Sequence, residues 1–145
     1  IMHVGKFSRG LGLCNPIEYI PSMELPDEEY PMKMMTGRVL YHYNACAMTD
    51  KTEGLNEISG HSFIEINTED AERIGIKDGD RVKVSSRRGS IETTANVSGK
   101  TNPGECWMPF HFLDGGANWL TSDALDSISS TPEYKVCAVK IENTK

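Results

Sequence analysis

HSFIEINTEDAERIGIKDGDRVKVSSRRGSIETTANVS, residues 61–98, carries the pattern that decides the fold. Apolar and polar side chains alternate in three parts of this stretch, a period that is typical of half-buried β-strands. These parts are His61–Asn67, Arg81–Ser86 and Ser90–Ser98. Three short strands separated by turns predict a mainly β domain in which helices are short.

A short helix and a hairpin turn connect these three strands. The helix is predicted at Glu69–Ile74, with Asn67 or Thr68 as its N-cap, and it ends at Gly75, a residue type that commonly follows the last helical turn. Arg87-Arg88-Gly89 has the composition of a hairpin turn. We interpret both arginines as exposed turn residues.

Three further strands are predicted outside this stretch. Met32–Tyr41, Cys106–Phe110 and Tyr134–Ile141 each combine apolar positions with flanking turn residues. Asp50–Gly60 predicts a polar loop or a short helical turn, and Trp119–Leu125 predicts another helical turn. Six short strands at this spacing favour a small barrel over a helical or βαβ domain. A closed barrel also leaves no strand edge unpaired.

The first 31 residues differ in composition from the rest of the chain. Prolines recur every five residues from Pro16 to Pro31, and proline at this density interrupts helices and supplies few donors to a sheet. We interpret residues 1–31 as an extended arm or linker from a preceding domain, and residues 32–145 as the barrel domain. Position 1 is Ile rather than Met, from which we expect a domain cut from a longer subunit.

The composition narrows the classes of function. The chain has 145 residues, of which 25% are charged, and a formal net charge of −6, so we do not expect a nucleic acid as its partner. No apolar run approaches the about 20 residues of a membrane span, so we expect no membrane insertion. The N-terminus does not show the apolar core of a signal peptide. We therefore expect a cytoplasmic location, with an exported parent protein as the alternative.

The positions of cysteine and histidine argue against a metal site within the chain. Four cysteines and four histidines are scattered and form no Cys-x-x-Cys pair, whereas zinc and iron–sulfur sites show close ligand spacing. We predict neither a metal ligand nor a catalytic residue. Cys106 and Cys137 fall in apolar alternation, and we interpret them as buried free thiols.

A second stretch, TGRVLYHYNACAMT at Thr36–Thr49, is the candidate for ligand binding. It begins at the end of a predicted strand and then presents a cation, an imidazole, a phenol and an amide. In chain order these are Arg38, His42, Tyr43 and Asn44. Small residues follow at 45–47. A chain that leaves a strand with several donors beside small side chains allows a ligand to approach its backbone.

Four segments of the chain together resemble one protein family. They are Thr36–Thr49, then Asn67–Gly89, then Met108–Phe112 with Asn118–Thr121, and finally Pro132–Val139. In this order, from about Cys14 to the C-terminus, the chain resembles the C-terminal molybdopterin guanine dinucleotide-binding domain of formate dehydrogenase catalytic (alpha) subunits. These belong to the dimethyl-sulfoxide-reductase family of molybdopterin oxidoreductases. Four segments in order are more specific than any single motif.

The resemblance implies a six-stranded double-psi β-barrel and a bis-(molybdopterin guanine dinucleotide) cofactor that carries molybdenum or tungsten. By position, it implies that the first dinucleotide is lined by Arg38, His42, Tyr43 and Asn44. It implies that the second dinucleotide is lined by Phe110, His111, Asn118, Tyr134 and Lys135. The chemistry of these side chains is suitable, because Arg38 and Lys135 offer positive charge to phosphates and the aromatic rings offer flat faces to heterocycles.

The resemblance also implies an activity and partners. The parent would be an oxidoreductase that oxidises formate to carbon dioxide, with its metal ligand and an iron–sulfur cluster in other domains. Its partners would be the other domains of the same catalytic subunit and electron-transfer subunits. We expect the isolated chain to be inactive. The chain departs from the family pattern at Ala45-Cys46-Ala47 and Asp50, where relatives often carry polar residues, so those contacts are either absent or made by backbone N–H groups.

Other functions fit parts of the sequence. A formylmethanofuran dehydrogenase subunit or a nitrate reductase would use an equivalent domain. A pyruvoyl-dependent decarboxylase has the same type of barrel and cleaves itself at a Gly-Ser bond such as Gly89-Ser90, although the ordinary turn composition there favours a hairpin. The remaining hypothesis is a cofactor-free barrel that serves as an interaction module. In that case Arg38 is a solvated charge and His42 a structural histidine.

Overall fold

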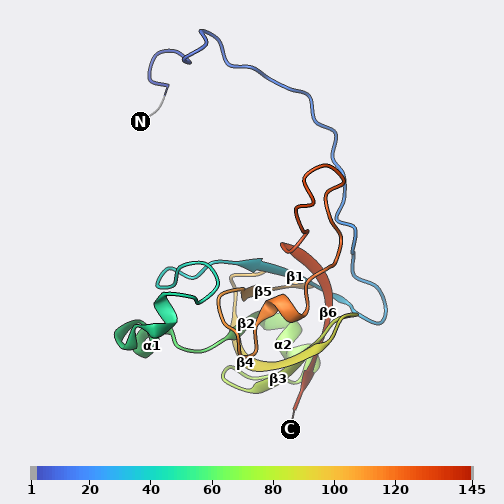
Figure 1. Ribbon diagram of the computed structural model, residues 1–145. Helices are drawn as coiled ribbons and strands as arrows, with labels where there is room; N and C mark the ends of the chain where they lie inside the picture. Colours follow the sequence, from blue (N-terminus) through green and yellow to red (C-terminus); the bar gives the residue numbers. More distant parts are fainter. Residues whose placement is uncertain (1–2, 145) are drawn as a thin grey trace.

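A computed structural model of the chain describes residues 3–144 and shows a closed barrel of six strands (Figure 1). The strands are β1 (Met32–Gly37), β2 (Phe63–Asn67), β3 (Arg81–Ser85), β4 (Ser90–Ser98), β5 (Glu105–Pro109) and β6 (Val136–Asn143). The order around the barrel is β1-β5-β2-β4-β3-β6, which confirms the predicted six-stranded barrel. Ile1, on which the expectation of a cut domain rests, lies outside the described residues.

Two of the six strand pairs are parallel. β1 runs parallel to β5, and β2 runs parallel to β4. The other neighbours are antiparallel, including β6 with β1, where Met35 near the end of β1 lies opposite Val136 at the start of β6. Since paired parallel strands end at the same side of a sheet, the chain leaves β1 and β5, and enters β6, at one end of the barrel.

The interior of the barrel is filled by apolar side chains that alternate along the strands. The fully buried ones include Met34, Ile64, Ile66, Val82, Val84, Met108 and Val139. The prediction that Cys106 and Cys137 are buried free thiols is confirmed. Burial raises the pKa of both thiols, that of Cys137 to about 12, so these sulfurs act as small apolar groups in the core.

The predicted helix after β2 is present as α2 (Thr68–Ile74). Its N-cap is Asn67, whose side-chain oxygen accepts from Glu69 N at 2.9 Å, as one of the two predicted alternatives requires. The helix ends at Gly75, which has a left-handed φ of 72° that glycine adopts without steric cost. The capping residues Asn67 and Gly75 therefore define the two ends of this helix.

The other helical segments are also short, with seven residues in α1 and three in each 3₁₀ turn. α1 (Glu53–Ser59) and the 3₁₀ turn η1 (Thr49–Lys51) occupy the connection for which a loop or helical turn was predicted. The turn predicted at Trp119–Leu125 is placed wrongly, because η2 spans Ala117–Trp119 and ends where Leu120 enters the core. The helices found in residues 3–144 are too short and too polar to cross a membrane.

The first predicted strand is shorter than expected. β1 ends at Gly37 rather than Tyr41, opposite Pro109, the last residue of its parallel partner β5. The Trp107 indole of β5 packs against the backbone at Gly37. A Cβ atom at Gly37 would lie 2.6 Å from Trp107 Nε1. The chain then turns away from the barrel, and Leu40 is 88% exposed. β4 has the predicted bounds, and the other strands differ from their predicted ends by one or two positions, as is usual for element boundaries.

The N-terminal arm extends away from the barrel over most of its length (Figure 1). Nearer to β1 it is held on the β3–β4 turn by ion pairs, Asp27 with Arg87 and Glu24 with Arg88. The interpretation of the turn as exposed is wrong for Arg88, whose side chain is only 23% exposed. Its partner Glu24 lies 64 positions away in the sequence, so no local pattern indicates the contact.

Candidate functional site

The segments that follow β1 and β5 and precede β6 meet at one end of the barrel. β1 and β5 pair up to their last residues, so the next residues along these parallel strands, Arg38 and Phe110, emerge beside each other. The Thr36 hydroxyl donates to Tyr134 O at 2.7 Å, which brings the segment before β6 to the same place. The strand register therefore assembles groups that are far apart in the sequence.

A groove of about 470 Å³ opens at this end of the barrel. Its lining includes five residues that the sequence predicts as cofactor contacts, namely Arg38, Asn44, Phe110, Asn118 and Tyr134. Ala45, Thr121 and Pro132 complete the lining. A sixth predicted contact, Lys135, lies at the edge, with Nζ 5.4 Å from the centre of the Phe110 ring. These nine residues are called the groove below.

Two cations flank the aromatic floor of the groove. Arg38 Cζ lies 5.0 Å from the centre of the Phe110 ring, and Lys135 Nζ lies 5.0 Å from that of Tyr134. Arg38 also donates to Asn44 Oδ1 from Nε and Nη2, at 3.3 and 3.2 Å. Within the described part of the chain neither cation forms an ion pair. Positive charge without a carboxylate partner favours an anionic ligand.

His42 and His111 lie behind the groove and are 6% and 2% exposed. Their rings stack with centres 3.9 Å apart. Both nitrogens of His42 have protein contacts, Nδ1 at 3.2 Å from the Thr49 hydroxyl and Nε2 at 2.5 Å from Ser59 O. His111 Nδ1 lies 2.9 Å from Asn44 O, and its buried Nε2 has no partner among the described residues. The stacked pair therefore positions the loop that carries Asn44.

The loop at 44–46 has an unusual backbone. Asn44 and Cys46 have φ values of 48° and 75°, in the left-handed region that costs other residues than glycine about 1–3 kcal/mol. Cys46 N lies 3.2 Å from His111 Nδ1, and burial, reinforced by the Asp50 carboxylate, raises the pKa of the Cys46 thiol. Between them, Ala45 lines the groove. A small side chain at this point leaves the loop backbone open to a ligand.

The structure combines residues that the sequence assigns to two separate dinucleotides. Arg38 and Asn44 from the first set share one groove with members of the second, while Tyr43 is 66% exposed and does not line it. The sequence reasoning did not select Thr121 and Pro132 as contacts. Both belong to the segments that match the family, and that match is the signal that would have found them.

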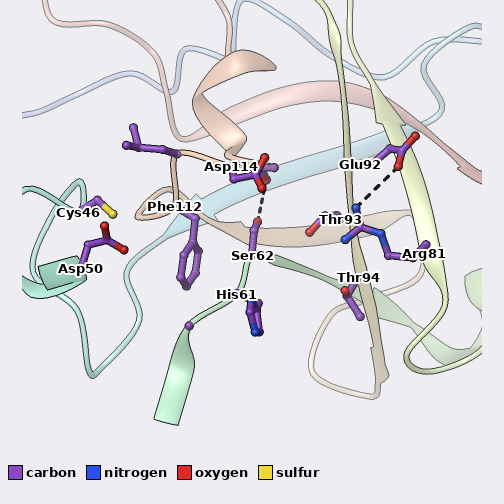
Figure 2. A pocket seen from close by; sticks show the side chains of 13 residues that line it. Cys46, Asp50, His61, Ser62, Arg81, Glu92, Thr93, Thr94, Phe112 and Asp114 are labelled. Carbon is purple, nitrogen blue, oxygen red and sulfur yellow. Dashed lines mark hydrogen bonds and ion pairs between the residues drawn. The ribbon is translucent and has the colours of Figure 1, made fainter. Parts of the chain in front are cut away.

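A second cavity, of about 480 Å³, lies between the Cys46–Asp50 segment and the β3–β4 hairpin (Figure 2). Its lining holds three carboxylates, those of Asp50, Glu92 and Asp114, and one arginine, Arg81. Arg81 is 3.7 Å from Glu92, so its charge is already countered. The surplus of negative charge disfavours phosphate groups here, and the groove is the better candidate for binding a dinucleotide.

Comparison with known proteins gives independent information on the chain as a whole. A family model described as "Molydopterin dinucleotide binding domain" matches residues 32–138. The "F420-dependent formate dehydrogenase 2 subunit alpha" of Methanococcus maripaludis is 46% identical over 98% of this chain and 21% of its own length. A "Nitrate reductase" of Symbiobacterium thermophilum is 43% identical over 82% of this chain and 16% of its own length. The chain thus spans about a fifth, or less, of these curated relatives.

Among solved structures, "Acetylene Hydratase from Pelobacter acetylenicus" superposes with a TM-score of 0.69 at 15% sequence identity. The superposition covers 79% of this chain and 18% of that one. Similarity at this level of identity shows a shared fold. Together with the closed six-stranded strand order, it confirms the expected double-psi β-barrel.

Proposed function

The chain belongs to the molydopterin dinucleotide-binding domain family, and we propose that it binds a bis-(molybdopterin guanine dinucleotide) cofactor as a domain of a formate dehydrogenase alpha subunit. The observation that carries this proposal is the 46% identity to such a subunit over 98% of the chain. The whole subunit would oxidise formate to carbon dioxide. This chain spans too little of its relatives to hold that activity alone.

The residues of the groove fit the chemistry of this cofactor. The cofactor presents pyrophosphates and flat heterocycles with many hydrogen-bonding edges. Arg38 and Lys135 are cations without ion-pair partners among the described residues, and they flank two aromatic rings that meet edge to face, 5.8 Å apart at 87°. Positive charge beside an aromatic surface suits a phosphate that is joined to a planar ring system.

Each group has a proposed role. Arg38 and Lys135 hold phosphate oxygens, and the amides of Asn44 and Asn118 bond to heterocycle edges. Phe110 and Tyr134 pack against planar rings. His42, His111 and Tyr43, which the sequence also selects, support the 44–46 loop or lie beside it rather than line the groove. When it is bound, the cofactor supplies the metal centre for oxidation and reduction, with molybdenum and tungsten both chemically suitable.

The remaining parts of the reaction are proposed for other regions of the parent protein. A metal-ligating side chain and an iron–sulfur cluster would belong to other domains of the same subunit. Electron-transfer subunits would be the further partners. The domain of this chain would hold and orient the dinucleotide, and it would exclude water from it.

The groove is tested by titrating the purified chain with guanosine diphosphate, which carries a guanine ring and a pyrophosphate. The exposed indole of Trp119, next to Asn118 in η2, reports binding by fluorescence. We expect saturable binding that is weakened about tenfold or more in Arg38→Ala/Lys135→Ala, because each cation makes charge-assisted bonds. Lys77→Ala, which removes an exposed cation from the turn before β3, is the matched control and leaves the affinity unchanged.

Equal affinity in the unchanged chain and the double variant would contradict the assignment of the groove. The cofactor itself is tested in the full-length parent protein by metal analysis and by acid release of guanosine monophosphate. Molybdenum or tungsten together with released nucleotide is expected. The absence of both would contradict the proposed function.

A second candidate, nitrate reduction with the same cofactor, is favoured by the 43% identity to a nitrate reductase. The domain would have the same role, and only the other domains would differ. Assays of the full-length protein with formate and with nitrate distinguish the two candidates, and turnover of formate alone is expected.

A further inference from the structure

The carboxylate of Glu24, on the arm, accepts a hydrogen bond from the backbone of β6 at a position beyond the end of β3. β3 ends at Ser85, which lies opposite Lys140 of β6, so Ala138 has no partner in β3. Its N–H donates instead to Glu24 Oε1 at 2.7 Å. A backbone donor at the end of a ladder needs such a partner when water cannot reach it. Glu24 thus completes the bonding of β6 from outside the barrel.

The same carboxylate is bound by Arg88 of the β3–β4 turn. Both terminal nitrogens of Arg88 contact it, Nη1 to Oε2 and Nη2 to Oε1, the second at 2.9 Å. The side chains of Glu24 and Arg88 are 11% and 23% exposed. A bidentate ion pair of this kind, largely shielded from water, fixes the relative orientation of the two side chains in addition to pairing their charges. Glu24, Arg88 and the Ala138 amide are called the clasp below.

The clasp is bonded to one wall of the groove. Arg88 Nη2 also donates to Leu120 O at 2.7 Å. Leu120 is fully buried and follows η2, which carries Asn118, and the Thr121 hydroxyl donates back to Asn118 O at 3.2 Å. Arg88 therefore fixes the end of the segment that presents Asn118 and Thr121 to the groove.

The clasp is also close to the other wall. Ala138 lies three residues after Lys135, whose carbonyl accepts from Thr36 N at 3.1 Å. Tyr134 and Lys135 are therefore held at one end by β1 and a short distance further on by Glu24. A single carboxylate of the arm supports both segments that contribute to the groove from the C-terminal part of the chain.

We propose that Glu24 is a positioning residue for the groove, so that seating of the arm and binding of the dinucleotide stabilise each other. This inference rests on the proposed function. When the carboxylate is in place, the Asn118 and Lys135 segments are already ordered, and the protein loses less conformational entropy when the ligand binds. Thermodynamic linkage makes the effect reciprocal, and a bound ligand must tighten the arm by the same factor.

Asp27 provides a matched control within the same arm. Its carboxylate pairs with Arg87 and accepts from Tyr30 N at 2.8 Å, so it also holds the arm. It is 48% exposed and makes no contact with Leu120 or Ala138 among the interactions found in residues 3–144. Asp27→Asn removes an exposed contact of the arm but leaves Glu24 seated on Arg88 and Ala138, whereas Glu24→Gln removes the charge that holds Arg88 in place.

The first experiment compares hydrogen exchange in the free 145-residue chain. In Glu24→Gln we expect faster exchange, by about fivefold or more, at the amides of residues 117–124 and 135–138. Asp27→Asn should leave both segments unchanged. Arg88→Lys keeps the charge but not the bidentate ion pair, and it is the second variant, with the same result expected. Unchanged exchange in Glu24→Gln and Arg88→Lys would overturn the inference.

The second experiment measures the coupling with guanosine diphosphate. We expect Glu24→Gln to weaken binding about fivefold or more, within the usual range of coupling between sites, and Asp27→Asn to leave it unchanged. Saturating ligand should slow exchange at residues 22–30 of the unchanged chain but not of Glu24→Gln. A purely structural role for Glu24 would lower stability without this ligand-dependent protection, and that result would overturn the coupling.

The two proposals fail in different ways. If the unchanged chain does not bind guanosine diphosphate, the proposed function fails, while exchange in the free chain still decides whether Glu24 orders the groove segments. If the chain binds the nucleotide with equal affinity in Glu24→Gln, the proposed function stands and the coupling is wrong.

Discussion

The groove and the clasp use the same kinds of side chain for opposite purposes. In the groove, Arg38 is bonded to a neutral amide and stacks on an aromatic ring, with no carboxylate paired to it. In the clasp, Arg88 is paired through two nitrogens with Glu24 and also donates to Leu120 O. One cation retains bonding capacity for an outside group, and the other has both terminal nitrogens engaged within the chain.

The difference shows how charge can be interpreted in this molecule. With a net charge of −6, carboxylates are plentiful, and several cations of the described chain pair with one. Arg81, Arg87 and Arg88 all do. The cations of the groove instead lie among aromatic and amide side chains. The type of partner, rather than the presence of an arginine, separates a binding surface from a structural contact.

The largest effect should come from removing Arg88. Arg88→Ala leaves the Glu24 carboxylate shielded from water without a counter-charge, and we expect a loss of about 2–3 kcal/mol of unfolding free energy, below the 3–5 kcal/mol of a fully buried pair because Arg88 is 23% exposed. Arg38→Ala should change the stability by less than about 0.5 kcal/mol. Urea unfolding measures both values, and equal losses would remove the distinction between clasp and groove.

Acid should weaken the clasp next. Burial alone would raise the pKa of Glu24, but hydrogen bonds from Arg88 and Ala138 and the charges of Arg88 and Arg87 outweigh it and lower the pKa. A lowered folded-state pKa adds stability above the usual Glu value of about 4.3, and that stability is lost as the pH falls through the folded-state pKa.

The measurement is the urea midpoint of the unchanged chain and of Glu24→Gln, from about pH 6 downward through the usual Glu range. We expect the gap between the two midpoints to close in acid, because protonated Glu24 resembles the glutamine. Asp27 and Glu105 also have lowered pKa values, and taking the difference between the two chains removes their contribution. A gap that does not depend on pH would argue against a charged clasp.

Salt should affect the groove more than the clasp. Raising the ionic strength from about 0.1 to 1 M shortens the Debye length from about 10 to 3 Å. Exposed cations attract a nucleotide less at high salt, and we expect the affinity for guanosine diphosphate to fall about fivefold. The stability difference between the unchanged chain and Glu24→Gln should change much less, since that pair is shielded. A larger effect of salt on the stability of the clasp than on nucleotide binding at the groove would contradict this comparison.

The smallest effect should come from the aromatic floor. Phe110 lies under Arg38 and Lys135, with ring-to-cation distances of 5.0 and 5.4 Å. Phe110→Leu keeps the apolar volume and removes the ring face, so we expect about 0.5–1 kcal/mol weaker nucleotide binding. Isothermal titration measures the change. An unaltered affinity would show that the ring packs the loop and does not contact the ligand.

Local patterns were sufficient for much of the fold. Alternation along β2, β3 and β4 is visible because each strand buries one face, and the caps at Asn67 and Gly75 act over a single helical turn. The early end of β1 was not predictable in this way, because β1 ends where its partner strand β5 ends, at the Gly37–Pro109 pair. Alternation within one strand cannot show where its partner ends.

For the candidate site, the sequence selected candidate residues but not their arrangement. The resemblance selected Arg38, Phe110 and Tyr134, and the barrel register then brought them together. It did not indicate that His111 lies behind the groove against Asn44 O, a contact that joins positions 67 residues apart. The Glu24–Arg88 pair, 64 positions apart, was not predicted for the same reason, because the sequence around each residue contains no pattern that indicates its partner.

The hydrogen bond between Thr36 and Tyr134 joins positions that are 98 residues apart, and it has a consequence for the biosynthesis of the domain. Contacts of such long range form late in folding, because the intervening chain must first be closed into a loop. The groove exists only once the first and last strands have met across β1 and β6. We therefore expect the groove to accept a dinucleotide only after the barrel has closed.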